Sequence, residues 1–171
     1  MSITDTSKAT IVYSVEKFLA KNTLEIETKA LQPYEGREAT QEDIDLDPLL
    51  NEGIAVVLNF VCGLGSPTAY NNTNAYLGVG NDATAPSATQ TGLLGASKAY
   101  KGMNATYPQI SAQDTIFQAD FIDGEGEFDW LEETVVNAAT DAGDNLCRQN
   151  TSLGTKPAGQ TWRLTATITW S

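Results

Sequence analysis

The chain has 171 residues, with 22 acidic and 10 basic side chains and a net charge of −12 at pH 7. A chain of this length can bury a core without a stabilising cofactor. Its negative charge repels phosphate backbones and anionic lipids, so neither nucleic acid nor a membrane is an expected partner. No apolar run approaches the roughly 20 residues of a membrane helix. The first residues lack the features of a signal peptide, so we expect synthesis in a cytoplasm.

The first 48 residues contain two segments of different composition. Residues 9–31 begin with five apolar side chains that fit one face of a helix, and continue with two that alternate with charges, as in a short strand. The five are Ile11, Val12, Val15, Phe18 and Leu19, and the two are Leu24 and Ile26. Both interpretations stay open.

Residues 32–48 hold two prolines, a glycine and six carboxylates. The carboxylates belong to Glu35, Glu38, Glu42, Asp43, Asp45 and Asp47. This composition predicts a solvated connection, with an acidic docking patch as the alternative.

A helix is predicted directly after this connection. Asn51 can cap it, four apolar side chains recur at helical spacing, and Gly63 ends it. The four side chains are Ile54, Val57, Leu58 and Val61.

The rest of the chain consists of short β-rich runs separated by Gly, Pro, Asn and Thr. The predicted strands cover residues 75–80, 96–102, 115–122, 126–136, 144–150 and 161–170. In the last strand, alternation predicts that Trp162, Leu164, Ala166, Ile168 and Trp170 face the core.

Strands at this spacing predict a mainly β fold. We expect an antiparallel, jelly-roll-like β-sandwich with one or two helices near the N-terminal half. We divide the chain into an N-terminal arm with the acidic connection, residues 1–48, and a sandwich domain that starts with the helix, residues 49–171.

The two cysteines, Cys62 and Cys147, lie far apart in the sequence and form no CxxC motif, so neither a zinc site nor a redox motif is supported. We interpret them as two buried thiols. A disulfide between them is the alternative.

Groups that handle protons or phosphate are scarce. The chain has no histidine, which removes Ser-His-Asp and Cys-His arrangements. The stretch "GLGSPT" lacks the third glycine of a dinucleotide fingerprint, and Gly78 and Gly80 are interpreted as turn or close-packing positions. We therefore predict no catalytic, cofactor-binding or metal-binding residue, and a protein that is not an enzyme.

One acidic stretch is the strongest candidate for chemistry. Its members are Asp123, Glu125, Glu127 and Asp129, with Glu132 and Glu133 just beyond. Paired carboxylates can hydrolyse glycosides and clustered ones can hold calcium, but Phe128 stands where an EF-hand loop needs glycine. The alternation instead predicts a solvated strand face opposite Phe128 and Trp130. We interpret Trp130, Trp162 and Trp170 as core residues, with ligand stacking as the alternative.

The chain from residue 76 onward carries a pattern of three stretches: "YLGVGNDATAPSATQTGL", "FDWLEETVVNA" and "DNLCRQNTSLGTKPAGQTWRLTATITWS". This pattern resembles small virion structural proteins of tailed bacteriophages. The matching positions are Gly78, Gly80, Ala85, Pro86, Thr91, Leu93, Glu132 or Glu133, Asn137, Ala138, Arg148, Gly154, Thr155, Lys156 and Trp162. The chain departs from the pattern at Gln90, where an acidic residue is usual.

The resemblance implies a non-enzymatic virion protein, made in a bacterial host cytoplasm. The expected role is that of a capsid decoration, or cement, protein that stabilises the major capsid lattice, with a tail, neck or baseplate component as the alternative. Expected partners are the major capsid protein or other virion proteins, and further copies of the chain, with a trimer favoured.

Two further expectations concern individual segments. Residues 1–31 are expected to form a swapped or reaching arm, because an acidic break separates them from the rest. A function from another class, a carbohydrate-binding module or carboxylate glycosidase, would use Trp130 and the stretch from Asp123 to Asp129.

Overall fold

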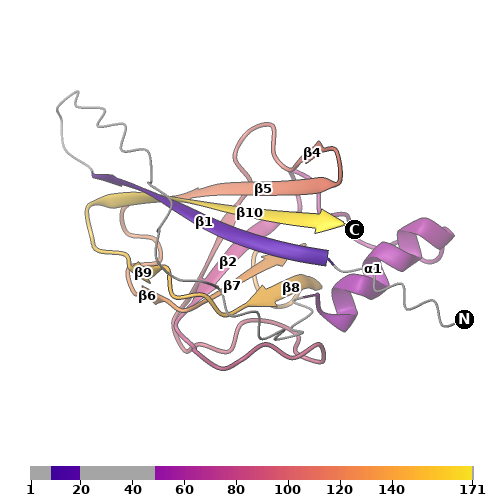
Figure 1. The fold of residues 1–171 in the computed structure, drawn as a ribbon, viewed down its shortest axis with the longest axis horizontal. Coiled ribbons are helices and arrows are strands. Elements are labelled where there is room, and N and C mark those ends of the chain that lie inside the picture. The colour runs from indigo at the N-terminus through magenta and orange to yellow at the C-terminus, as the bar shows by residue number, and fades with distance from the viewer. Residues whose placement is uncertain (1–8, 20–48, 171) are drawn as a thin grey trace, which may run out of the picture.

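The structure is a computed structural model that describes residues 9–19 and 49–170. It is mainly β, with 42% strand and 9% helix, and its antiparallel sheets pack together as a sandwich. Two four-stranded sheets form the two layers (Figure 1), which is the strand number of a jelly roll. The predicted fold class is confirmed.

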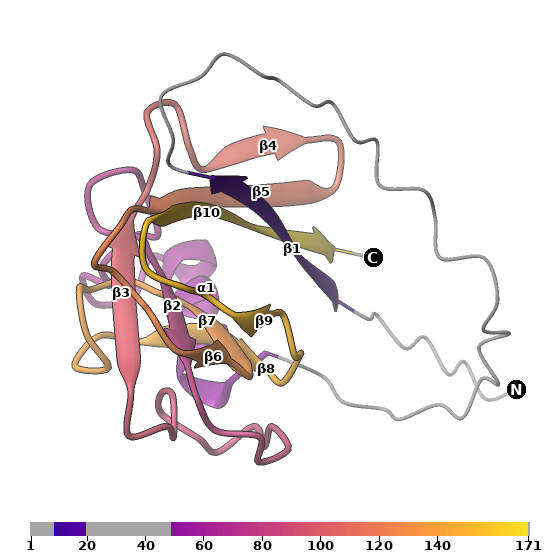
Figure 2. The ribbon, with the colours of Figure 1, turned by 90° about the vertical axis from the view of Figure 1, so that its left-hand side faces the viewer.

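The first sheet has the strand order β1-β10-β5-β4 (Figure 2). Its strands are β1 (Ala9–Leu19), β10 (Gln160–Trp170), β5 (Asp114–Phe121) and β4 (Gln109–Ser111). The alternation predicted for β10 is confirmed, since Trp162, Leu164, Ala166 and Ile168 are buried and the intervening threonines point outward. The short strand β4 was not expected from the sequence.

The helical interpretation of residues 9–19 is wrong. These residues form β1, which pairs with β10 over its whole length, from Ala9 opposite Trp170 to Leu19 opposite Gln160. Ile11 and Tyr13 face the core, whereas Val12 is 58% exposed. Pairing with the long edge of β10 therefore overrides the local helical spacing, as tertiary context often does.

The second sheet has the strand order β3-β2-β7-β8. Its strands are β3 (Lys98–Gly102), β2 (Tyr76–Gly80), β7 (Glu132–Val136) and β8 (Asn145–Gln149). A short ladder of β6 (Asp129–Trp130) and β9 (Gly154–Thr155) lies beside it. The single strand predicted over 126–136 is wrong in extent, because Gly124 and Gly126 adopt positive φ angles of 82° and 64° and turn the chain before β6 begins.

The core lies between the two sheets and is centred on aromatic side chains. Trp130 contacts the rings of Phe121 and Trp162 edge to face, with centroid distances of 4.9 and 5.0 Å. Trp130 and Trp162 are almost completely buried, which confirms their core interpretation and excludes ligand stacking on either ring. Trp170 is half-buried, and its indole nitrogen donates to Thr115.

The helix α1 (Asn51–Cys62) ends at the predicted place, where Gly63 adopts a left-handed conformation. Two details of the prediction are wrong. The cap position is Leu50 and makes no side-chain cap bond. Leu58 and Val61 are exposed, because α1 packs on β8 only through its N-terminal half, where Gly53 lies against the backbone of Leu146.

The domain division stays a prediction, because residues 20–48 lie outside the described part of the chain. Their possible strand and acidic connection are therefore not described. Residues 9–19 of the expected arm contribute β1 to the first sheet. No helix in the described ranges is long and apolar enough to cross a membrane.

The cysteine interpretation is correct for Cys147, which is buried, and wrong for Cys62, which is exposed. Both are free thiols, so the alternative of a disulfide is not realised. Cys62 is exposed because it lies at the end of α1 that extends beyond the sheets (Figure 1).

Candidate functional site

The outer face of the second sheet carries an unusual set of buried polar residues. In the register, Glu132 on β7 lies opposite Gly80 on β2, and Thr134 lies between Gly78 on β2 and Arg148 on β8. Because side chains alternate along each strand, these residues share the face that points away from the core. The loop of residues 81–97 covers this face.

Glycine is required at two positions of β2 because the covering side chains approach its backbone closely. A Cβ atom at Gly80 would overlap the carboxylate of Glu132. A Cβ atom at Gly78 would lie 2.7 Å from Cγ2 of Thr134 and 2.8 Å from the ring of Tyr100. The interpretation of these glycines as close-packing positions is confirmed.

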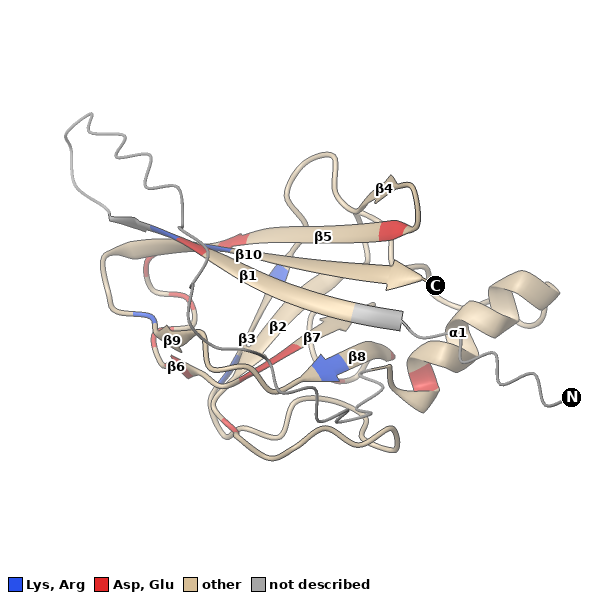
Figure 3. Ribbon diagram, in the orientation of Figure 1, with Lys and Arg blue, Asp and Glu red and all other residues tan. Residues whose placement is uncertain are grey.

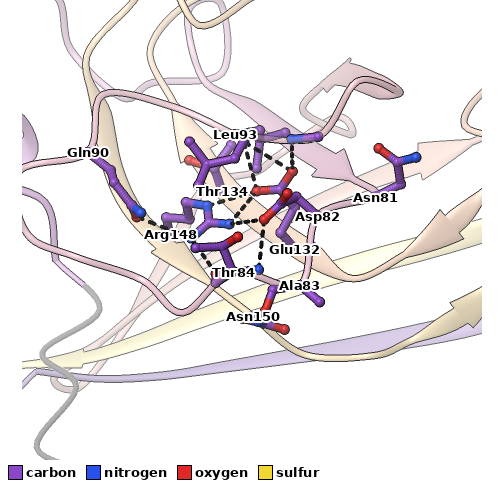
Figure 4. Close-up of polar contacts among 12 residues, drawn as sticks. Asn81, Asp82, Ala83, Thr84, Gln90, Leu93, Glu132, Thr134, Arg148 and Asn150 are labelled. Atoms are coloured by element: carbon purple, nitrogen blue, oxygen red, sulfur yellow. Dashed lines mark hydrogen bonds and ion pairs between the residues drawn. The ribbon is translucent and has the colours of Figure 1, made fainter.

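Glu132 and Arg148 form a fully buried ion pair at the centre of this face (Figure 4). Nε and Nη2 of Arg148 lie 2.8 and 2.7 Å from Oε2 of Glu132. The same carboxylate accepts hydrogen bonds from two backbone amides of the covering loop, Leu94 at 2.9 Å and Gly95 at 2.6 Å. Glu132 thus connects the loop of residues 81–97 to β7 by hydrogen bonds.

Arg148 binds the other half of the loop. Its Nη1 donates to the carbonyl of Thr84 at 3.0 Å and to Oε1 of Gln90 at 3.1 Å (Figure 4). Asp82 lies 3.8 Å from Nη2 and adds a longer-range attraction. Hydrogen bonds from Thr84, more than Arg148, hold the pKa of Asp82 below its usual range.

Hydrogen bonds at both ends of the loop complete its attachment. The amide of Ser97 donates to Oδ1 of Asn81 at 2.9 Å. The amide of Leu93 donates to Oδ1 of Asp141 at 3.1 Å. The loop of residues 81–97 is therefore fixed at its ends and in its middle, although it contains no strand or helix.

The buried ion pair is stabilised against desolvation by further partners of most of its polar atoms, although Nη2 of Arg148 has only its ion-pair contacts with Glu132 and the more distant Asp82. Moving a charged group out of water costs several kcal/mol, which is offset only when the pair has good geometry and additional hydrogen bonds. Glu132 has the two loop amides, and Arg148 has the carbonyl of Thr84 and the amide oxygen of Gln90. The pair therefore stabilises the sheet only while the loop stays in place.

A second polar group lies on the opposite, core-facing side of β7. Glu133 is fully buried, and neither of its carboxylate oxygens has a hydrogen-bond partner within the described residues. Burial, and then the charge of Glu132, raise the pKa of Glu133 to about 9; the nearby backbone amide of Thr151, which lies outside hydrogen-bond geometry, and the charge of Arg148 offset only part of this rise. Glu133 is therefore protonated at neutral pH.

The neighbours of Glu133 are also polar groups in an apolar interior. Gln149 lies opposite it in the register, and its Oε1 is buried without a partner within the described residues. The hydroxyl of Tyr13 and the thiol of Cys147 share a hydrogen bond of 3.2 Å. Burial raises the pKa of Cys147 to about 11, so this thiol is not activated as a nucleophile.

Three carboxylates of the acidic stretch from Asp123 to Asp129 bind other groups of the protein. Glu125 binds Lys101 at 2.7 Å, Asp123 accepts from the amide of Gly159, and Glu127 accepts from the amide of Gly124. Within residues 9–19 and 49–170, no three acidic or cysteine side chains are grouped closely enough to hold a metal ion.

The structure brings together only part of the bacteriophage-like pattern. Gly78, Gly80, Glu132 and Arg148 meet on the outer face of the second sheet, and Leu93 lies in the loop that covers this face. Others lie elsewhere: Asn137 binds the carbonyl of Thr68, Lys156 the carbonyl of Ile122, Thr155 the carboxylate of Asp129, and Trp162 packs in the core. Of the two glutamates that the pattern leaves open, Glu132 is the one that binds Arg148.

The position at which the chain departs from the pattern, Gln90, contacts the buried ion pair. Gln90 contacts Arg148 through its amide oxygen, so an acidic side chain at this position would add a third carboxylate to Glu132 and Asp82 around Arg148. The roles of Leu94, Gly95 and Thr84 could not be found from the sequence, because they bind through backbone atoms that any residue carries.

No protein-family model matches this chain, and neither a curated protein nor a solved structure is significantly similar to it.

Proposed function

We propose that the protein is a non-enzymatic structural component of a tailed-phage virion, and that it acts as a capsid decoration protein on the major capsid lattice. One observation carries this proposal: the buried Glu132–Arg148 pair fixes the exposed loop of residues 81–97 to the sandwich. A contact surface that is rigid before binding loses little conformational entropy when it binds.

The use of the charged groups supports a role in binding rather than in catalysis. The two most deeply buried charges, on Glu132 and Arg148, bind each other and the loop. The chain has no histidine, and the thiol of Cys147 has a raised pKa. Function then depends on shape and contact area. On a symmetric lattice, several weak contacts made at once give a high overall affinity, because the first contact raises the effective concentration for the others.

The protein would act as a homo-oligomer, with a trimer favoured, because decoration of a lattice uses its local symmetry. Its partners would be the major capsid protein and other virion proteins, and its location would be the virion. The loop of residues 81–97 is the surface we assign to the lattice contact.

Electron cryo-microscopy of the encoding phage, with and without the gene for this chain, tests the proposal. We expect density for the sandwich on the outside of the head, and heads that become fragile while tails stay normal when the gene is deleted. Density on the tail, neck or baseplate, with stable full heads that lack tails after deletion, would contradict the decoration role and favour that alternative.

The carbohydrate-binding alternative requires an exposed Trp130 on which a sugar could stack. Trp130 is completely buried, and its indole nitrogen donates to the carbonyl of Gly126 at 2.8 Å. No described feature therefore favours sugar binding over the structural role.

A further inference from the structure

The end of α1 that points away from the sheets is an exposed apolar surface. Leu58, Phe60, Val61 and Leu64 are 55%, 49%, 79% and 60% exposed. These four are half of the large apolar side chains that the described residues expose, and they fall within seven consecutive positions. Figure 1 shows this end of α1 extending beyond the sandwich. Such a patch on a soluble protein marks an interaction surface.

Four of the six exposed residues of α1 have the spacing of a helix-packing seam, and the other two are Phe60 and Val61. Asn51, Ala55, Leu58 and Cys62 are all exposed and follow each other at intervals of four, three and four residues. This is the spacing of positions a and d in a coiled coil, which place side chains between those of a facing helix. The small side chain of Ala55 allows close approach. The geometry of this surface, which we call the α1 seam, is suited to another helix.

Charge decides which helix fits the α1 seam. No charged residue occurs from residue 53 to residue 81, although the chain carries a net charge of −12. Figure 3 shows α1 without charge beyond its first turn, where Glu52 lies. Copies of this chain repel each other across most surfaces, but not across this one.

The acidic segment of the same chain is a poor occupant of the seam. Residues 32–48 carry six carboxylates, and the C-terminal end of a helix carries a partial negative charge that repels them. The last turn of α1 holds no basic residue that would compensate. Within residues 9–19 and 49–170, α1 is the only helix, so another copy of the chain offers a matching seam through its own α1.

We infer that copies of this chain associate through their α1 seams, with Leu58 and Cys62 at the contact. This inference rests on the homo-oligomer in the proposed function and names the surface that forms it. In a trimer the seams would surround the three-fold axis. The contact is small, so association is expected to depend on protein concentration.

Thiol cross-linking of the full chain tests the contact. Cys62 is exposed and Cys147 is buried, so a short bismaleimide reacts at Cys62. We expect covalently linked copies whose yield rises with protein concentration and disappears in Cys62→Ser. The matched control is the double variant Cys62→Ser with Ile110→Cys, which moves the thiol to an 82% exposed site on β4. Equal cross-linking in this control would overturn the inference.

Light scattering during size-exclusion chromatography supplies the second readout. Leu58→Asp places a charge in the seam and should weaken association on the order of tenfold or more. Ile110→Asp, at an apolar position away from α1 that is 82% exposed against 55% for Leu58, should leave the oligomer unchanged. Both sites are exposed, so the fold should persist, which circular dichroism checks.

The outcomes separate this inference from the proposed function. A wild-type chain that stays monomeric, or an oligomer that survives Leu58→Asp, overturns the α1 contact, whatever the protein does on a virion. Loss of the oligomer in Leu58→Asp supports the contact even if no density for the protein is found on the phage head.

Discussion

Glu132 and Glu133 are neighbours in the sequence but lie in different environments, one paired with an arginine and the other in the core. Both lie on β7 and both are fully buried. Glu132 points to the outer face, where Arg148 and two loop amides bind it. Glu133 points to the core, where its carboxylate oxygens have no hydrogen-bond partner within the described residues and burial raises its pKa to about 9.

The difference shows that burial alone does not decide the state of a carboxyl group. Because side chains alternate along β7, the two side chains lie on different faces of the sheet. The groups on each face then determine whether the carboxyl group is ionised or protonated. The outer face offers an arginine and free backbone donors. The core offers an apolar interior with few donors, so protonation replaces pairing.

The largest expected effect comes from removing the partner of Glu132. Arg148→Met keeps much of the side-chain volume but leaves the Glu132 carboxylate buried without its cation, and should cost about 3–5 kcal/mol of unfolding free energy. Urea denaturation measures this cost. The loop of residues 81–97 should also become sensitive to protease, because its contacts to Arg148 are lost. A loss below about 1 kcal/mol would show that the ion pair does not hold the loop.

The second prediction concerns the pH dependence that Glu133 causes. Its pKa is about 9 in the folded protein and has a usual value of 4.5. The folded state therefore binds the proton more tightly, and unfolding free energy falls as pH rises from about 4.5 towards 9, by at most roughly 1.4 kcal/mol per pH unit. Below this window the contribution is fully present.

Glu133→Gln should remove this slope, because its side chain does not titrate. The stability advantage of the variant over the wild type should grow between pH 5 and pH 8.5, as measured by urea denaturation. Tyr13, Cys147, Glu132 and Arg148 are the other titratable groups near this site, and they remain in both proteins. Parallel pH profiles would contradict the protonated state of Glu133.

The third prediction tests the close approach of β2 to Glu132. Gly80→Ala places a Cβ atom into the Glu132 carboxylate and should cost about 1–3 kcal/mol through overpacking. Gly102→Ala is the matched control, since Gly102 also ends a strand but its Cβ atom would lie 3.5 Å from the nearest atom, in the ring of Tyr76. Thermal unfolding should separate the two variants. Equal melting temperatures would contradict the packing described for Glu132.

The smallest effect is expected at the position where the chain departs from the bacteriophage-like pattern. Gln90→Glu adds a third carboxylate around Arg148 and should stabilise the protein by about 0.5–1 kcal/mol. Thr89→Glu adds the same charge at an exposed neighbouring position and should have little effect. Destabilisation by Gln90→Glu, measured by urea denaturation, would show that the site around Arg148 is already saturated with negative charge.

The sequence predicted those elements whose pattern is local. The alternation from Trp162 to Ile168 identified β10, and Gly63 identified the end of α1, because both signals lie within the element itself. The same reasoning was wrong for residues 9–19, whose conformation depends on pairing with β10 about 150 positions away in the chain.

The sequence indicated some residues of the candidate site but not that they lie together. Arg148 and the glutamate pair were singled out only as positions of the bacteriophage-like pattern, and Gly78 and Gly80 suggested close packing. Their meeting point depends on strand order and on backbone atoms of the loop, which carry no sequence signature. Whether Glu132 or Glu133 binds Arg148 is decided by which of them faces outward, and a shift of one residue in register would reverse it.

The central claim is that the Glu132–Arg148 pair holds the loop of residues 81–97 on the sandwich, and amide hydrogen exchange tests it most directly. The amides of Leu94 and Gly95 donate to Glu132, so both should exchange slowly in the wild type and become fast in Arg148→Met. If these two amides exchange in the wild type as fast as that of exposed Thr89, the loop is not held and the account is contradicted.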